Sequence, residues 1–102
     1  MKLILCEKCS DVVSLRLNID RQCFCGKSGG RYIDEVNAEV WGPCFKLGFA
    51  NSSIVSALRK QKYDGDSTET MFYGGEQVTV GRDFRAFVIP ESAKSMKRIG
   101  DN

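Results

Sequence analysis

Four cysteines in two closely spaced pairs constrain this 102-residue chain more than any other feature. Two residues separate Cys6 from Cys9, one residue separates Cys23 from Cys25, and thirteen residues lie between the pairs. Tetrahedral zinc binds four thiolates, and two tight turns that each carry a cysteine pair can direct all four sulfurs at one ion. The spacing therefore predicts one structural Zn²⁺ ion held by Cys6, Cys9, Cys23 and Cys25.

The residues after each pair refine this prediction. Gly26 follows the second pair, where a turn around a metal often needs a residue that tolerates positive φ. Ser10 and Asp11 follow the first pair instead, and the second pair is one residue tighter than the usual spacing. With those two departures, residues 1–35 resemble a zinc ribbon, in which two cysteine-bearing turns join short strands. The resemblance implies a module braced by its metal, and such modules serve many functions.

Other interpretations of the cysteines are a pair of disulfides, redox chemistry at the first pair, or simple burial. Disulfides are typical of exported proteins, but the cysteine count of five is odd. Only three apolar residues run into Cys6, whereas a signal peptide has an apolar stretch of about 7–15 residues. We therefore expect reduced thiols and a cytoplasmic location. The fifth cysteine, Cys44, is predicted to be a buried small hydrophobic residue.

Composition limits the class of protein. With 42% hydrophobic and 27% charged residues, the chain is predicted to be a single globular domain over residues 1–102. No apolar run approaches the about 20 residues of a membrane span, so no membrane segment is expected. The net charge of +2 is far from the basic excess of a dedicated duplex-binding protein. The chain has no histidine, which removes the commonest general base and predicts a protein that is not an enzyme.

Hydrophobic patterning predicts an α+β fold, in which the zinc ribbon continues into a mostly antiparallel sheet with one main helix. That helix is expected at about 52–62, with Asn51, Ser52 and Ser53 capping its start and Gly65 ending it. An acidic loop is expected over 64–70. Strands are expected at 2–5, 12–19, 31–34, 38–41 and 45–49.

The remainder of the chain is predicted less uniquely. Residues 77–80 and 84–89 alternate on either side of a glycine-containing turn and are predicted to form a hairpin. Residues 91–99 are compatible with a short helix that is acidic at its start and basic at its end, or with a frayed tail.

Candidate ligand-binding residues cluster after the second cysteine pair. The run Gly26-Lys27-Ser28 lacks the earlier glycine of a P-loop, because position 21 is Arg. A glycine-rich turn with nearby cations can still present backbone N–H groups to an anion, although the glycines can equally serve only to shape the metal turn. The predicted ligand-binding residues are Lys27, Ser28, Arg31, Tyr32, Arg82 and Arg85.

These features favour a small non-enzymatic, zinc-stabilised binding protein whose ligand is a nucleotide or nucleic acid, since guanidinium and aromatic groups hold phosphates and stack bases. The alternative is a protein–protein adaptor or inhibitor in which zinc is purely structural. In size and style the chain is also similar to small proteins of phages and mobile elements, which implies action on a host system. The oligomeric state is left open, with a homodimer as one expected form.

Overall fold

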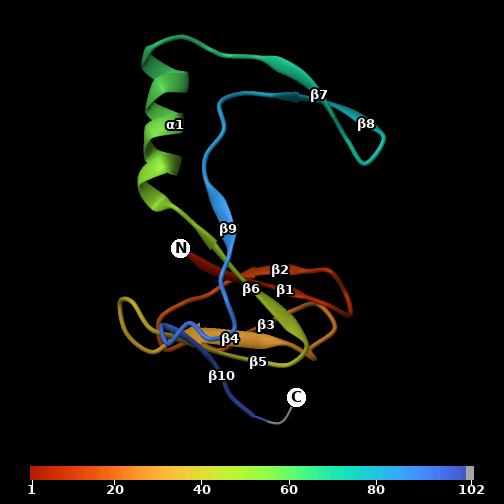
Figure 1. Cartoon of the computed structure of the whole chain (residues 1–102), viewed down its shortest axis with the longest axis vertical. Helices are drawn as coiled ribbons and strands as arrows, with labels where there is room; N and C mark the ends of the chain where they lie inside the picture. The colour runs from red at the N-terminus through yellow and green to blue at the C-terminus, as the bar shows by residue number, and fades with distance from the viewer. Residues whose placement is uncertain (101–102) are drawn as a thin grey trace. The chain divides into compact units, whose positions relative to one another are not determined.

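The computed structural model describes residues 1–100, which divide into two compact units. The first unit comprises Met1–Gly48 together with the segment from Ala86 onward, and the second comprises Phe49–Arg85. Strands predominate in the first unit, and α1 (Asn51–Tyr63), the α-helix of the described residues, lies in the second (Figure 1). This content agrees with the predicted α+β class, whereas the expectation of one domain over 1–102 stays a prediction.

One four-stranded sheet of the first unit is built around the first cysteine pair. Its order is β2-β1-β6-β9, formed by β2 (Val12–Ser14), β1 (Lys2–Cys6), β6 (Cys44–Phe49) and β9 (Ala86–Val88). β1 runs antiparallel to both β2 and β6, and Cys6 lies opposite Cys44. The strand predicted over 12–19 is wrong beyond Ser14, because the chain turns at Asn18, whose φ is 56°.

The other sheet of the first unit contains the second cysteine pair between two of its strands. Its order is β10-β5-β4-β3, formed by β10 (Met96–Arg98), β5 (Ala38–Trp41), β4 (Gly29–Tyr32) and β3 (Arg21–Gln22). β10 runs parallel to β5, and the remaining pairs are antiparallel. The helix or frayed tail predicted for 91–99 is therefore wrong. Met96 has no exposed surface, so hydrophobic burial holds this segment as an edge strand.

Both sheets contribute to one hydrophobic core in the first unit. Cys44 is 4% exposed, which confirms the prediction that it is a buried small residue. Lys46 is also buried, and its ammonium group donates to the backbone oxygen of Glu91 at 3.1 Å and lies 3.4 Å from the Glu91 carboxylate. The buried members of the core are Ile4, Cys6, Val13, Leu15, Cys23, Ala38, Val40, Cys44 and Met96.

The second unit contains the predicted helix, which spans Asn51–Tyr63 and confirms the expected position. Its cap differs from the prediction, because the N-cap residue is Ala50 and the Ser53 hydroxyl donates to the Ala50 carbonyl at 2.8 Å. Gly65 follows the C-cap with a φ of 110°, as expected for a helix end. Within the described residues, no helix has the length and apolar character that a membrane crossing requires.

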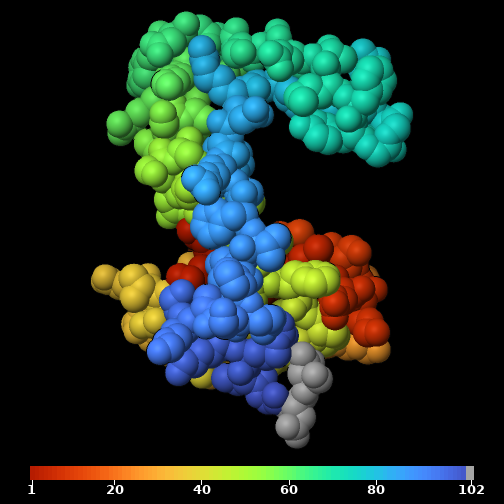
Figure 2. Space-filling view, in the orientation of Figure 1, coloured from red at the N-terminus to blue at the C-terminus, as the bar shows by residue number. Residues whose placement is uncertain are grey.

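A two-stranded hairpin completes the second unit. β7 (Glu69–Tyr73) and β8 (Glu76–Val80) pair through Gly74 and Gly75, which both have positive φ. The predicted hairpin between 77–80 and 84–89 is wrong, because 86–88 forms β9 beside β6. The loop predicted over 64–70 is also shorter than expected, since β7 begins at Glu69. In the space-filling view the hairpin, coloured teal, projects from its helix (Figure 2).

Candidate metal centre

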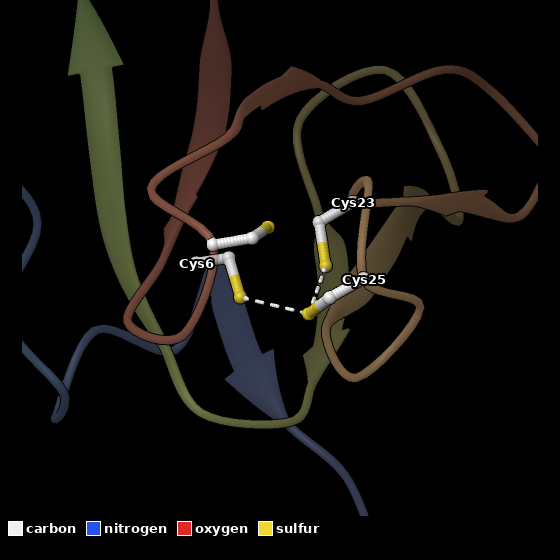
Figure 3. Close-up of side chains that lie close together, drawn as sticks. Cys6, Cys23 and Cys25 are labelled. Atoms are coloured by element: carbon white, nitrogen blue, oxygen red, sulfur yellow. Dashed lines mark hydrogen bonds between the residues drawn. The ribbon is translucent and has the colours of Figure 1, made fainter.

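The two cysteine pairs converge on one point of the first unit. Cys6 ends β1 and Cys9 lies on the turn after it, while Cys23 and Cys25 lie on the turn between β3 and β4. All four sulfur atoms lie within 4.8 Å of one another. The Cys25 sulfur is 3.7 Å from that of Cys6 and 3.5 Å from that of Cys23 (Figure 3). Metal–sulfur bonds of about 2.3 Å at tetrahedral angles separate sulfurs by about 3.8 Å, so this arrangement fits a metal ion.

The two turns differ in length, but each is closed by a backbone hydrogen bond from a residue with positive φ to the carbonyl of its first cysteine. The Ser10 amide donates to the Cys6 carbonyl at 2.9 Å, and the Gly26 amide donates to the Cys23 carbonyl at 3.0 Å. The donor residue has positive φ in both turns, 61° at Ser10 and 76° at Gly26. The expectation at Gly26 is thus confirmed. Ser10 adopts the same conformation without being glycine, which costs an L-residue about 1–2 kcal/mol.

Hydrogen-bond donors surround the sulfurs as a metal site requires. The Lys8 amide points at the Cys6 sulfur and the Ser28 amide at the Cys23 sulfur, each at 3.4 Å. The Ser28 hydroxyl reaches the Cys6 sulfur at 3.4 Å as well. Such donors favour thiolate over thiol and orient the ligand atoms.

The thiols respond differently to this environment. The Ser28 hydroxyl lowers the pKa of Cys6 to about 6, against the opposing effect of burial. Burial also opposes ionisation of Cys23, but hydrogen bonds from the Ser28 amide and the Cys25 thiol still lower its pKa. The Lys27 amide favours the Cys25 thiolate, yet burial and the neighbouring sulfurs together raise the pKa of Cys25 to about 11. Because adjacent thiolates repel one another, all four ionise together at neutral pH only around a cation.

The predicted ligand residue Ser28 makes its contacts with the cysteine cluster and its surroundings. Its side chain has no exposed surface, and its hydroxyl is shared between the Cys6 sulfur and the Pro43 carbonyl, the latter at 3.0 Å. Gly29 and Gly30 are also buried in β4, where they pair with β3 and β5. These residues form part of the sheet instead of an open anion-binding turn.

Arg31 and Tyr32 likewise make contacts within the first unit. The Arg31 guanidinium binds Asp20 at 2.9 Å and Glu39 at 3.0 Å, and it lies 5.6 Å from the centre of the Trp41 ring. The pKa of Arg31 is raised, and the main cause is its hydrogen bond to the Asp20 carboxylate. The Tyr32 hydroxyl accepts the Lys2 backbone N–H at 2.7 Å, and the Lys2 ammonium lies over the Tyr32 ring.

The remaining predicted residues are divided between the units. Lys27 is exposed in the first unit. Arg82 belongs to the second unit and donates to the Gln61 side chain and the Gly65 carbonyl, at 3.3 and 2.7 Å. Arg85 is in the second unit too, and its backbone N–H donates to the Ser53 hydroxyl at 2.8 Å. The predicted set is therefore not one cluster within either unit.

Phe24 is a feature of this site that the sequence analysis did not single out. It lies between two cysteines of the cluster, Cys23 and Cys25, and is 91% exposed. Its backbone N–H donates to the Asp11 carboxylate at 2.9 Å, which ties the second turn to the first. A residue between two ligands spaced this tightly must direct its side chain away from the metal. An aromatic residue at that position was therefore a signal available in the sequence.

Comparisons with family models, curated proteins and solved structures do not add to this description. No family model matches the chain, no curated protein matches it, and no solved structure matches it. The resemblance to proteins of phages and mobile elements gains no support from them. The geometry of the cysteine cluster and its surroundings therefore carries the functional argument.

Proposed function

We propose that the four cysteines bind one structural Zn²⁺ ion and that residues 1–35 act as a zinc ribbon. The supporting observation is the convergence of the four sulfurs within 4.8 Å. Four thiolates in a tetrahedral array are a ligand set typical of zinc and of iron–sulfur centres, and elemental analysis distinguishes the two metals. With four protein ligands the coordination shell is complete, so the ion braces the fold and has no open position for a substrate.

Elemental analysis of protein purified under reducing conditions tests the metal. We expect one zinc per chain, and loss of zinc when Cys9 or Cys25 is replaced by serine. The Cys44→Ser variant is the matched control, because Cys44 is a buried cysteine outside the cluster and should leave zinc content unchanged. Stoichiometric zinc in Cys9→Ser, or none in the wild type, would contradict the proposal.

We further propose a non-enzymatic binding role in which the metal presents Phe24 to a nucleotide or to single-stranded nucleic acid. The exposed Phe24 ring is held on a metal-braced turn, and the exposed cations Lys8 and Lys27 lie on the two cysteine turns. Stacking of a base on an aromatic ring contributes about 1–3 kcal/mol, and nearby cations add phosphate contacts. This combination suits flexible single strands better than duplex, because duplex affinity depends on many clustered cations.

Titration of the zinc-loaded protein with a fluorescent oligothymidylate tests this role. We expect Phe24→Ala to weaken binding at least about fivefold, the lower bound of a stacking contribution. Phe72→Ala is the matched control, because Phe72 is also highly exposed, at 74%, but lies in the second unit. Equal binding by wild type and Phe24→Ala, or tighter binding to an arbitrary duplex, would exclude this surface.

A second candidate function is protein binding, which the β7–β8 hairpin favours. Every residue of β7 is exposed, including the aromatic residues Phe72 and Tyr73. An isolated two-stranded hairpin is marginally stable in water. A protein that covers these side chains would stabilise it, and a second copy of this chain is the simplest such partner.

Sedimentation velocity over a range of concentrations distinguishes the partner. A dimer that the Phe72→Ser substitution dissociates would support self-association through the hairpin. A monomer at all concentrations, or a dimer indifferent to Phe72→Ser, would exclude the second copy as the partner.

A further inference from the structure

A hollow of about 300 Å³ lies in the first unit, and none of the residues that line it is a cysteine. Its wall comes from two segments that are distant along the chain, the loop and strand from Ile33 to Glu39 and the segment from Lys94 to Lys97. Its volume is at the lower end of the range for small-molecule sites, which is about 300–1,000 Å³. The residues that line it are Ile33, Asn37, Ala38, Glu39, Lys94 and Lys97.

The two walls are fixed to each other by backbone hydrogen bonds. The Ala38 amide donates to the Ser95 carbonyl at 2.9 Å, immediately before the parallel pairing of β5 with β10. In that pairing Met96 lies opposite Ala38, and Lys97 lies opposite Glu39. Met96 and Ala38 are 0% and 2% exposed, so both strands are anchored in the core. The hollow is consequently preformed, and a ligand would not have to assemble it.

The loop at the rim is also ordered by its own contacts. One oxygen of the Asp34 carboxylate accepts the backbone N–H groups of Val36 and Asn37 at 2.8 and 2.7 Å, and the other accepts the Asn37 side-chain amide at 2.8 Å. The Ile33 amide donates to the Asn37 carbonyl at 2.9 Å. The Asp34 carboxylate is thus hydrogen-bonded by donors of its own loop.

The charges around the hollow are unequal. Lys94 and Lys97 are both exposed, and within residues 1–100 neither side chain has a hydrogen bond or an ion pair. The one acidic lining residue, Glu39, is bound by the Arg31 guanidinium at 3.0 Å. Exposed lysines ordinarily extend into solvent, but here Lys94 and Lys97 border one preformed hollow. The negative charge of Glu39 in that hollow is already neutralised by Arg31. That arrangement attracts anions.

The lining also has an apolar part. Ala38 is buried and Ile33 is half exposed, so the hollow offers an apolar contact beside its two ammonium groups. A bare inorganic anion would leave that contact unused, whereas a phosphate ester with an organic body would use both. We propose that this hollow binds a small phosphomonoester, with Lys94 and Lys97 holding the phosphate group and Ile33 contacting the organic part. The site is distinct from the metal centre and from the Phe24 surface, and it does not depend on either.

Amide chemical-shift mapping on the zinc-loaded, full 102-residue chain tests the site. The probes are inorganic phosphate, ribose 5-phosphate and AMP, titrated at constant ionic strength. With inorganic phosphate and ribose 5-phosphate we expect saturable shifts confined to residues 33–39 and 94–97, whereas AMP should shift these residues and also those around the Phe24 surface. The dissociation constant measured at residues 33–39 and 94–97 should be below about 1 mM for at least one ester. A lower dissociation constant for AMP than for ribose 5-phosphate would assign the organic part as a nucleoside, and equal values would assign it as the sugar. Either result supports the site.

The double variant Lys94→Gln, Lys97→Gln should raise that dissociation constant at least about tenfold, because both charge-assisted hydrogen bonds are lost. The matched control is Lys60→Gln, Lys62→Gln, which removes the same charge from exposed positions of the second unit. Zinc content and oligothymidylate binding should be unchanged in the first double variant, which separates this site from the proposed function. Absence of saturable shifts at residues 33–39 and 94–97, ribose 5-phosphate shifts centred on Lys27, or an equal loss in the control would overturn the proposal.

Discussion

Replacing Gly26 with alanine isolates the backbone strain in the second cysteine turn. A Cβ atom at Gly26 would meet only the Gln22 side-chain oxygen, at 3.9 Å, which is ordinary contact. The cost therefore comes from φ, which is 76°. An L-residue in this conformation loses about 1–2 kcal/mol, and the smaller entropy of the unfolded chain returns about 0.4–1 kcal/mol. We expect a net loss of about 1 kcal/mol.

At the proposed zinc site, metal binding would be coupled to folding of this region, so the loss should be measured as zinc affinity. Competition with a chromophoric chelator should show about fivefold weaker binding in Gly26→Ala. Ser10→Gly is the reciprocal variant, since Ser10 has a φ of 61° at the equivalent place in the first turn. Relief of its strain should tighten zinc binding by up to about fivefold. Unchanged affinity in Gly26→Ala, or weaker affinity in Ser10→Gly, would refute the claim that both turns need this conformation in the metal-bound state.

Four further predictions concern the stability of the fold. Glu91→Ala should lower the free energy of unfolding by about 1–3 kcal/mol, because the buried Lys46 loses its carboxylate partner. Lys46→Met should leave the free energy of unfolding nearly unchanged. A large decrease in that free energy, measured by urea denaturation, would contradict this. The pKa of Glu91 is lowered from 4.5, and the main cause is the hydrogen bond from the Arg98 guanidinium. The ion pairs of Glu91 therefore contribute stability above about pH 4.5, and this contribution is lost as the pH falls. The difference in melting temperature between wild type and Glu91→Gln should therefore shrink in acid, and a constant difference would contradict the assignment. Thermal unfolding followed by Trp41 fluorescence in the first unit and by helical circular dichroism in the second should coincide, because a 13-residue helix is marginal alone. Separate midpoints would contradict the prediction of one domain.

The cysteine cluster and the helix were predictable because each has a strong local signal. Cysteine spacing alone identified the four residues whose sulfurs converge. The helical pattern at 52–62 lies within the observed Asn51–Tyr63. Its cap was predicted wrongly because Ser53 bonds to Ala50 and Arg85 instead of capping the first turn. Side-chain caps depend on tertiary neighbours that the local sequence does not specify.

Strand pairing was less predictable because two glycine-containing turns compete. The alternating pattern predicted a hairpin that joins 77–80 to 84–89 through Gly81, but Gly74 and Gly75 form a two-residue turn with positive φ at both positions. Such a turn matches the twist of a hairpin and pairs β7 with β8. Segment 86–88 then pairs with β6. Pairings of this kind, between residues far apart in the chain, leave no local trace.

Alternation along a strand also does not identify its buried face. In β6 the apolar residue Phe45 is half exposed, while Cys44 and Lys46 point into the core. The antiparallel pairing that places Cys44 opposite Cys6 fixes this orientation. For the same reason the roles of Ser28 and Arg31 were not predictable, because their partners come from distant segments.

The first unit is interrupted by the second, and the place of the interruption has a consequence for how the protein can change over time. β6 and β9 are neighbours in one sheet, so the chain leaves and re-enters that sheet at adjacent points. Within the second unit the Ala50 amide bonds to the Arg85 carbonyl at 2.9 Å, which brings its two ends together as well. A short hairpin loop of about 2–5 residues can close such a gap. We therefore expect that a short loop can replace residues 49–85 while the cysteine cluster and the order of strands in its two sheets are kept.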